Sequence, residues 1–87
     1  MMSGYSRIPV KAKCEDAISG VEFEIDTEGL DCIVKAINTD MWVYIKQGAP
    51  SSESYFLKAD ETFEFCGKLY YKVSGLGKVY TFMYNRL

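Results

Sequence analysis

The sequence contains no histidine, and its three cysteines, Cys14, Cys32 and Cys66, form no CxxC pair. Zinc sites in proteins are built mainly from cysteine and histidine, so zinc would need a carboxylate as its fourth ligand here. We therefore expect no metal site and no other cofactor. Cys14 and Cys32 are interpreted as small apolar residues on strand faces.

The absence of histidine also bears on catalysis, because only a carboxylate or a lysine is left to activate a serine or cysteine nucleophile. No serine lies in a nucleophile elbow or a Ser-x-x-Lys context. The segment Gly75–Lys78 lacks the full spacing of a phosphate-binding loop. The acids Glu22 and Glu24 are explained by lysines on a neighbouring strand. We expect no catalytic residues and no enzymatic activity.

Positive charge is scarce, with 10 Lys and Arg against 12 Asp and Glu and a net charge of −2. A nucleic-acid backbone calls for a positive surface, so nucleic acid is disfavoured as a partner. The longest apolar run is far shorter than the roughly 18 to 20 residues of a membrane-spanning helix. The first seven residues lack the apolar centre of a secretory signal. We expect no membrane partner and folding in the cytosol.

Apolar residues recur with a period of two, and no window of eleven or more residues has helical spacing. Nine of the thirteen aromatic residues lie between Tyr55 and Tyr84. A chain of 87 residues has room for one domain. We predict an all-β fold, a single small antiparallel β-sandwich or jelly-roll-like barrel of about seven strands. It would cover residues 7–87 and follow a flexible arm at residues 1–6.

The expected strands are Arg7–Cys14, Val21–Ile25, Leu30–Ile37, Met41–Lys46, Tyr55–Leu57, Thr62–Phe65, Leu69–Val73 and a return strand from Lys78. Two hairpins are predicted among them. In the first, the lysines of Arg7–Cys14 face the glutamates of Val21–Ile25, Lys13 opposite Glu22. In the second, Ser74–Gly77 forms a tight turn that places Leu69–Val73 beside the return strand.

Asp26, Glu28 and Asp31 crowd a turn that contains glycine, and hard oxygen ligands of this kind suit calcium. Their spacing is not that of an EF-hand. An ordinary solvated turn also accounts for these acids, so the calcium interpretation stays open beside it.

Two strands carry apolar residues on both faces, Met41–Lys46 and the return strand from Lys78. A two-layer sandwich needs only one apolar face per strand, and soluble monomers rarely expose large apolar patches. We therefore expect neighbouring copies or other proteins to cover the second face. The alternative is a carbohydrate-binding module with surface aromatics. The candidate interface or binding residues are Tyr5, Trp42, Tyr44, Tyr70, Tyr80 and Tyr84.

About half of the chain resembles small β-sandwich virion proteins of tailed bacteriophages. The resemblance lies in Trp42–Lys46 followed by a Gly/Pro/Ser loop, in Tyr55–Phe65, and in Tyr71–Gly75 before Lys78–Tyr80. It implies a non-enzymatic structural protein of the virion, assembled in the bacterial host cytoplasm. Such a protein decorates the capsid, forms a head fibre or joins head to tail. Its partners would be copies of itself and other virion proteins. The resemblance carries over no functional residue.

Overall fold

The computed structural model describes residues 7–86, so the predicted arm at residues 1–6 and the candidate Tyr5 lie outside the described residues. The all-β prediction is confirmed: six strands form one antiparallel sheet in the order β1-β6-β2-β5-β3-β4. The strands are β1 (Arg7–Ala17), β2 (Phe23–Ile37), β3 (Met41–Tyr44), β4 (Tyr55–Leu57), β5 (Thr62–Val73) and β6 (Gly77–Arg86). A single 3-10 turn, η1 (Ser51–Glu53), interrupts the loop between β3 and β4.

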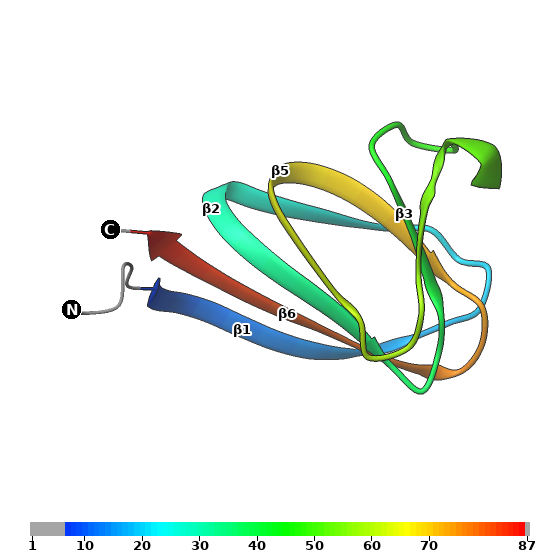
Figure 1. Cartoon of the computed structure of the whole chain (residues 1–87), viewed down its shortest axis with the longest axis horizontal. Helices are drawn as coiled ribbons and strands as arrows, with labels where there is room; N and C mark the ends of the chain where they lie inside the picture. Colours follow the sequence, from blue (N-terminus) through cyan, green and yellow to red (C-terminus); the bar gives the residue numbers. More distant parts are fainter. Residues whose placement is uncertain (1–6, 87) are drawn as a thin grey trace.

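The sheet folds over on itself because β2 and β5 both turn sharply at one end of the molecule (Figure 1). At this corner Glu28 and Gly29 have φ values of 53° and 89°, and Gly67 on β5 has a φ of 119°. The buried Thr27 hydroxyl accepts a hydrogen bond from the Gly67 N–H at 2.8 Å. The prediction of separate strands on either side of the Asp26–Gly29 turn was wrong. Corner residues bend one long strand there.

Both predicted hairpins were wrong, because the strands pair with distant partners. β1 pairs with β6, with Lys13 opposite Thr81, rather than with the segment Val21–Ile25 that contains Glu22. β5 pairs with β2 and β3, and β2 separates β5 from β6 in the sheet. The charges pair with other partners as well: Lys13 lies 3.7 Å from Glu15, and Lys68 lies 3.8 Å from Glu24. Lys11, Lys13 and Glu24 share only the lining of a cleft of about 130 Å³.

The segment between β5 and β6 crosses the end of the β2–β3 connection instead of forming a tight hairpin turn. The Ser74 N–H donates to the Asp40 carbonyl at 3.0 Å, and the Gly75 N–H donates to the Thr39 hydroxyl at 3.0 Å. A Cβ on Gly77 would lie 2.3 Å from the Ile37 carbonyl oxygen. Glycine is needed at position 77 because the two backbones approach so closely.

The hydrophobic core lies between the two parts of the folded sheet. Alternate residues of each long strand point into it, as period-two patterning requires. On β2 the inward residues Cys32, Val34 and Ala36 have almost no exposed surface. The other buried apolar members are Ala17, Ile25, Met41, Val43, Leu57, Leu69, Tyr71, Val73, Val79 and Met83.

Candidate functional site

The outer surface of β6 carries apolar side chains although the inner surface of the same strand already fills the core. Tyr80 and Phe82 point outward, while their neighbours Val79 and Met83 are buried. Strand pairing places Cys14 and Ala12 of β1 beside Tyr80 and Phe82, and Ile33 of β2 on the other side of Phe82. We call these outward residues, Ala12, Cys14, Ile33, Tyr80 and Phe82, the β6 face.

Charged pairs border the β6 face. Lys78 donates to the Asp16 carboxylate at 2.7 Å, which lowers the pKa of Asp16 and raises that of Lys78. At the other end the Arg7 guanidinium approaches Glu64 at 4.0 Å. These charged groups leave the aromatic and aliphatic centre of the face exposed, an arrangement typical of protein contact surfaces.

The sequence candidate Tyr84 is also on β6, but it is fully buried. Its ring stacks on Phe82 with 5.8 Å between the centroids. The Arg7 guanidinium lies 5.1 Å from the centroid of the Tyr84 ring. Tyr84 therefore anchors one end of the β6 face and offers no open ring surface.

A second aromatic surface lies on the outside of β3 and its neighbours. Trp42 packs against Phe56 of β4 with ring centroids 5.4 Å apart, and it pairs with Lys72 of β5. Tyr44 stacks on Tyr70 at 6.1 Å. We call these five residues, Trp42, Tyr44, Phe56, Tyr70 and Lys72, the β3 face. It includes three of the sequence candidates and lies on a different strand set from Tyr80.

The loop between β3 and β4 covers part of the β3 face. One oxygen of Glu22 accepts hydrogen bonds from the Tyr44 hydroxyl and the Gly48 N–H, both at 2.8 Å. The bond from Gly48 and then that from Tyr44 lower the pKa of Glu22. Burial, reinforced by Glu22, raises the pKa of Tyr44. Tyr44 is only 4% exposed, so its outward ring is covered within the chain.

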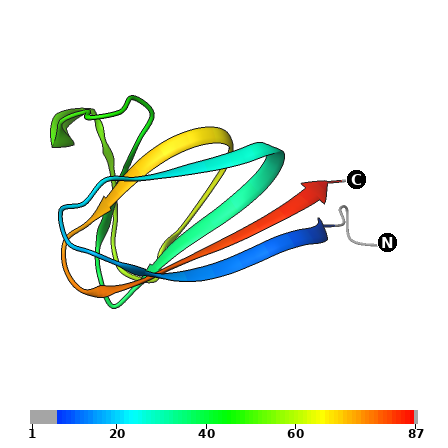
Figure 2. The same cartoon turned by 180° about the vertical axis from the view of Figure 1, so that it is seen from behind.

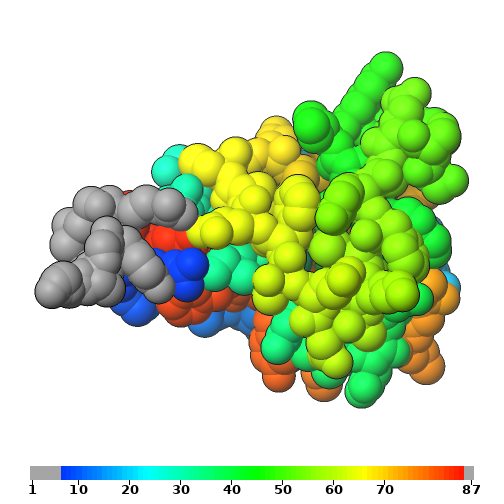
Figure 3. Space-filling model, in the orientation of Figure 1, coloured from blue at the N-terminus to red at the C-terminus, as the bar shows by residue number. Residues whose placement is uncertain are grey.

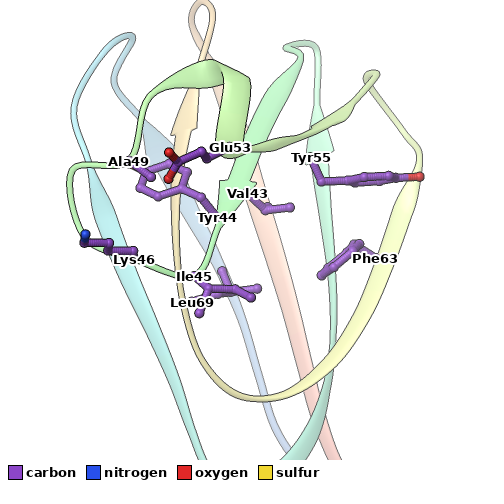
Figure 4. Close-up of a pocket in the computed structure, with 9 residues that line it drawn as sticks. All are labelled: Val43, Tyr44, Ile45, Lys46, Ala49, Glu53, Tyr55, Phe63 and Leu69. Carbon is purple, nitrogen blue, oxygen red and sulfur yellow. The ribbon is translucent and has the colours of Figure 1, made fainter.

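Two hollows flank this loop, which belongs to the green segment that projects from one end of the molecule (Figure 3). The first, of about 310 Å³, lies over the β3 face between Trp42, Lys72 and Pro50. The second, of about 260 Å³, lies on the opposite side of β3 (Figure 4). In that hollow the Tyr55 and Phe63 rings are 5.5 Å apart and form one wall. The second hollow is mainly aromatic and aliphatic, whereas the first also contains Ser51 and Ser54.

The structure thus divides the sequence candidates between two surfaces: Trp42, Tyr44 and Tyr70 on the β3 face, and Tyr80 and Tyr84 on β6. Sequence reasoning missed Phe56 and Glu22. The Tyr55–Phe56 pair in a strand was a signal for an outward ring, since alternate residues face opposite sides. No pattern in the sequence indicated that Glu22 would hold the β3–β4 loop.

The acidic corner proposed for calcium is a bend in β2. The Asp26 carboxylate accepts a hydrogen bond from the Glu28 N–H at 3.0 Å, as in an ordinary Asx turn. Within residues 7–86, no three His, Cys, Asp or Glu side chains are grouped closely enough to hold a metal ion. The same part of the chain contains no helix that is long and apolar enough to span a membrane.

Comparisons with protein-family models, with curated proteins and with solved structures give no significant match to this chain.

Proposed function

We propose that this chain is a non-enzymatic structural protein of a virion that acts by associating with itself and by docking on other virion proteins. The observation that carries the proposal is the β6 face, where Tyr80 is 44% exposed and Phe82 half-buried on a strand whose other side fills the core. Apolar patches bordered by charges mark contact surfaces in soluble proteins. The resemblance to tailed-phage virion proteins supplies the setting.

The contribution of Tyr80 can be estimated from its exposure. A tyrosine side chain buries about 200 Å² when fully covered, and Tyr80 is 44% exposed, so a partner would cover roughly 90 Å² of it. At about 25 cal/mol per Å², this burial favours association by roughly 2 kcal/mol. Such an increment changes an association constant about 30-fold.

Size-exclusion chromatography with light scattering tests self-association. We expect an oligomer whose mass rises with concentration, and a shift towards smaller species in Tyr80→Ser. Tyr55→Ser is the matched control, because Tyr55 is 59% exposed on a different surface. A wild-type chain that stays monomeric up to about 1 mM, a concentration at which an interface of only about 4 kcal/mol would already associate, would contradict the proposal.

Mass spectrometry of purified particles tests the setting. We expect the chain to copurify with virion proteins in a fixed ratio to them, and Tyr80→Ser to lower that ratio. A chain that is abundant in the infected cell but missing from the particles would refute the virion part of the proposal.

The β3 face favours a second candidate function, a carbohydrate-binding module. The Trp42 ring and Lys72 border a hollow of about 310 Å³ that also contains Ser51 and Ser54, and sugars are commonly bound by a stacking ring beside polar groups. A glycan array separates the two functions. Binding abolished by Trp42→Ala and unchanged by Tyr80→Ala, on the other surface, would support the sugar site. No bound glycan would remove it.

A further inference from the structure

β1 is a long edge strand. It lies at one end of the strand order and is bordered by β6 alone among the described strands. Both views place it at the margin of the molecule (Figures 1 and 2). Ten of its eleven residues are exposed. The opposite edge, β4, is only three residues long. An exposed edge of this length presents backbone N–H and C=O groups that can pair with another strand.

The protected part of the β1 edge is its beginning. Pro9 has no N–H group, and the pairing register with β6 shifts between Pro9 and Lys11. Proline and bulges are devices that prevent strands from adding to an edge. The remainder, Lys11–Ala17, has neither device and stays in regular register with β6. This is the part of β1 on which a further strand fits.

The charges of β1 indicate which strand can pair with its edge. Its basic residues, Arg7, Lys11 and Lys13, precede its acidic residues, Glu15 and Asp16. An antiparallel second copy of β1 brings the basic part of each strand towards the acidic part of the other. A parallel copy would place like charges side by side, which is destabilising. The edge is thus complementary to itself in the antiparallel orientation.

We propose that β1 of one copy pairs antiparallel with β1 of a second copy, around a two-fold axis at Cys14. This register places Lys13 of each copy opposite Glu15 of the other, twice by symmetry. Within one chain Lys13 and Glu15 are already 3.7 Å apart, with side chains about 60% exposed, so both groups can reach a partner. An axis at Lys13 would oppose two lysines, and an axis at Ala12 would oppose Lys11 to Lys13.

The pairing continues the sheet from one copy into the next and aligns their β6 faces. Cys14 and Ala12 lie beside Tyr80 and Phe82, so the two β6 faces become neighbours on one side of the joined sheet. The inference rests on the proposed function, because it names the edge through which the copies meet. The joined β6 faces form one larger apolar surface, through which such dimers associate with further copies or dock on other virion proteins.

A charge exchange tests the edge contact by light scattering or sedimentation. Lys13→Glu and Glu15→Lys each create two like-charge pairs in the homodimer, so each variant alone should dimerise at least about tenfold more weakly than wild type. An equimolar mixture should dimerise again, because the two variants oppose unlike charges at both pairs. Loss of the Lys13–Glu15 contact within one chain cannot produce this recovery. A mixture no heavier than its components would overturn the inference.

The register is tested with Cys14 as a reporter. Facing residues of antiparallel strands have Cα atoms about 4.5 to 5.5 Å apart, within the range of a disulfide. In a buffer of oxidised glutathione, which accepts the two electrons and two protons of the thiols, we expect a covalent dimer. Cys14→Ser should abolish it and Cys66→Ser, at the other exposed cysteine, should leave it. A covalent dimer that requires Cys66 instead would overturn this register.

These measurements distinguish failure of the edge contact from failure of the proposed function. An oligomer that is lost in Tyr80→Ser but unchanged in both β1 charge variants would overturn the edge inference and leave the proposed function in place. A wild-type chain that is monomeric at every concentration would overturn both.

Discussion

The Thr27 hydroxyl is predicted to hold the corner at which the sheet folds over. Thr27 has no exposed surface, and its oxygen accepts the Gly67 N–H at 2.8 Å where β2 and β5 both bend. Thr27→Val keeps the shape of the side chain and removes the acceptor. A buried donor left without a partner costs about 1 to 3 kcal/mol. The free energy of unfolding of a domain this size is roughly 4 to 13 kcal/mol, so the loss would be a large fraction of it.

Urea unfolding followed by the fluorescence of Trp42, the single tryptophan, measures this effect. We expect Thr27→Val to lower the transition midpoint with little change in the slope, because the same surface is exposed on unfolding. Thr62→Val is the matched control, since Thr62 is an exposed threonine on β5. Its effect should stay within about 0.5 kcal/mol. If the two variants unfold at the same urea concentration, the hydrogen bond does not stabilise the corner.

Three further predictions follow from single contacts. Gly77→Ala should cost about 3 kcal/mol or more in thermal or urea unfolding, because the added Cβ would lie 2.3 Å from the last carbonyl oxygen of β2, whereas Gly75→Ala should be nearly neutral. Ellman's reagent should label the exposed Cys66 quickly and the buried Cys32 only on unfolding. Burial raises the pKa of Cys32 to about 11, so between pH 9 and 11 the thiol ionises only in the unfolded chain. The free energy of unfolding should therefore fall as the pH rises through this range. Because the pKa of Glu22 is lowered in the folded chain, its contribution to the free energy of unfolding is present above the ordinary pKa of 4.5 and is lost as the pH falls below it. Glu22→Gln should therefore make the free energy of unfolding depend less steeply on pH in the acid range.

Along one part of β5, the sequence was sufficient to predict which residues face the core. Alternation along Leu69–Val73 places Leu69, Tyr71 and Val73 on one side, and all three are buried. This success has a local cause, because successive side chains of a strand point to opposite faces wherever the strand lies in the sheet. The same reasoning separated Tyr80 from the buried Val79.

Strand partners could not be predicted in the same way. Ser74–Gly77 has the composition of a hairpin turn, yet neither of its glycines has a positive φ, and Gly77 serves a close crossing of two backbones. The Asp26–Gly29 segment does supply positive φ values, but it bends one strand instead of separating two. Turn residues fix a local bend, while the pairing is decided by strands far away in the sequence.

The difference between local alternation and distant strand pairing also explains why apolar residues on both faces of a strand have one cause on β3 and another on β6. On β3, the second face is covered within the chain, because Glu22 binds both the Tyr44 hydroxyl and the Gly48 N–H and so holds the loop over the ring. On β6, no described loop or strand covers Tyr80, which lies next to the open edge strand β1. An apolar second face therefore indicates a partner only where the chain has no segment of its own to place over it. That condition selects β6, and it is why substitution at Tyr80 should alter association whereas substitution at Tyr44 should alter folding.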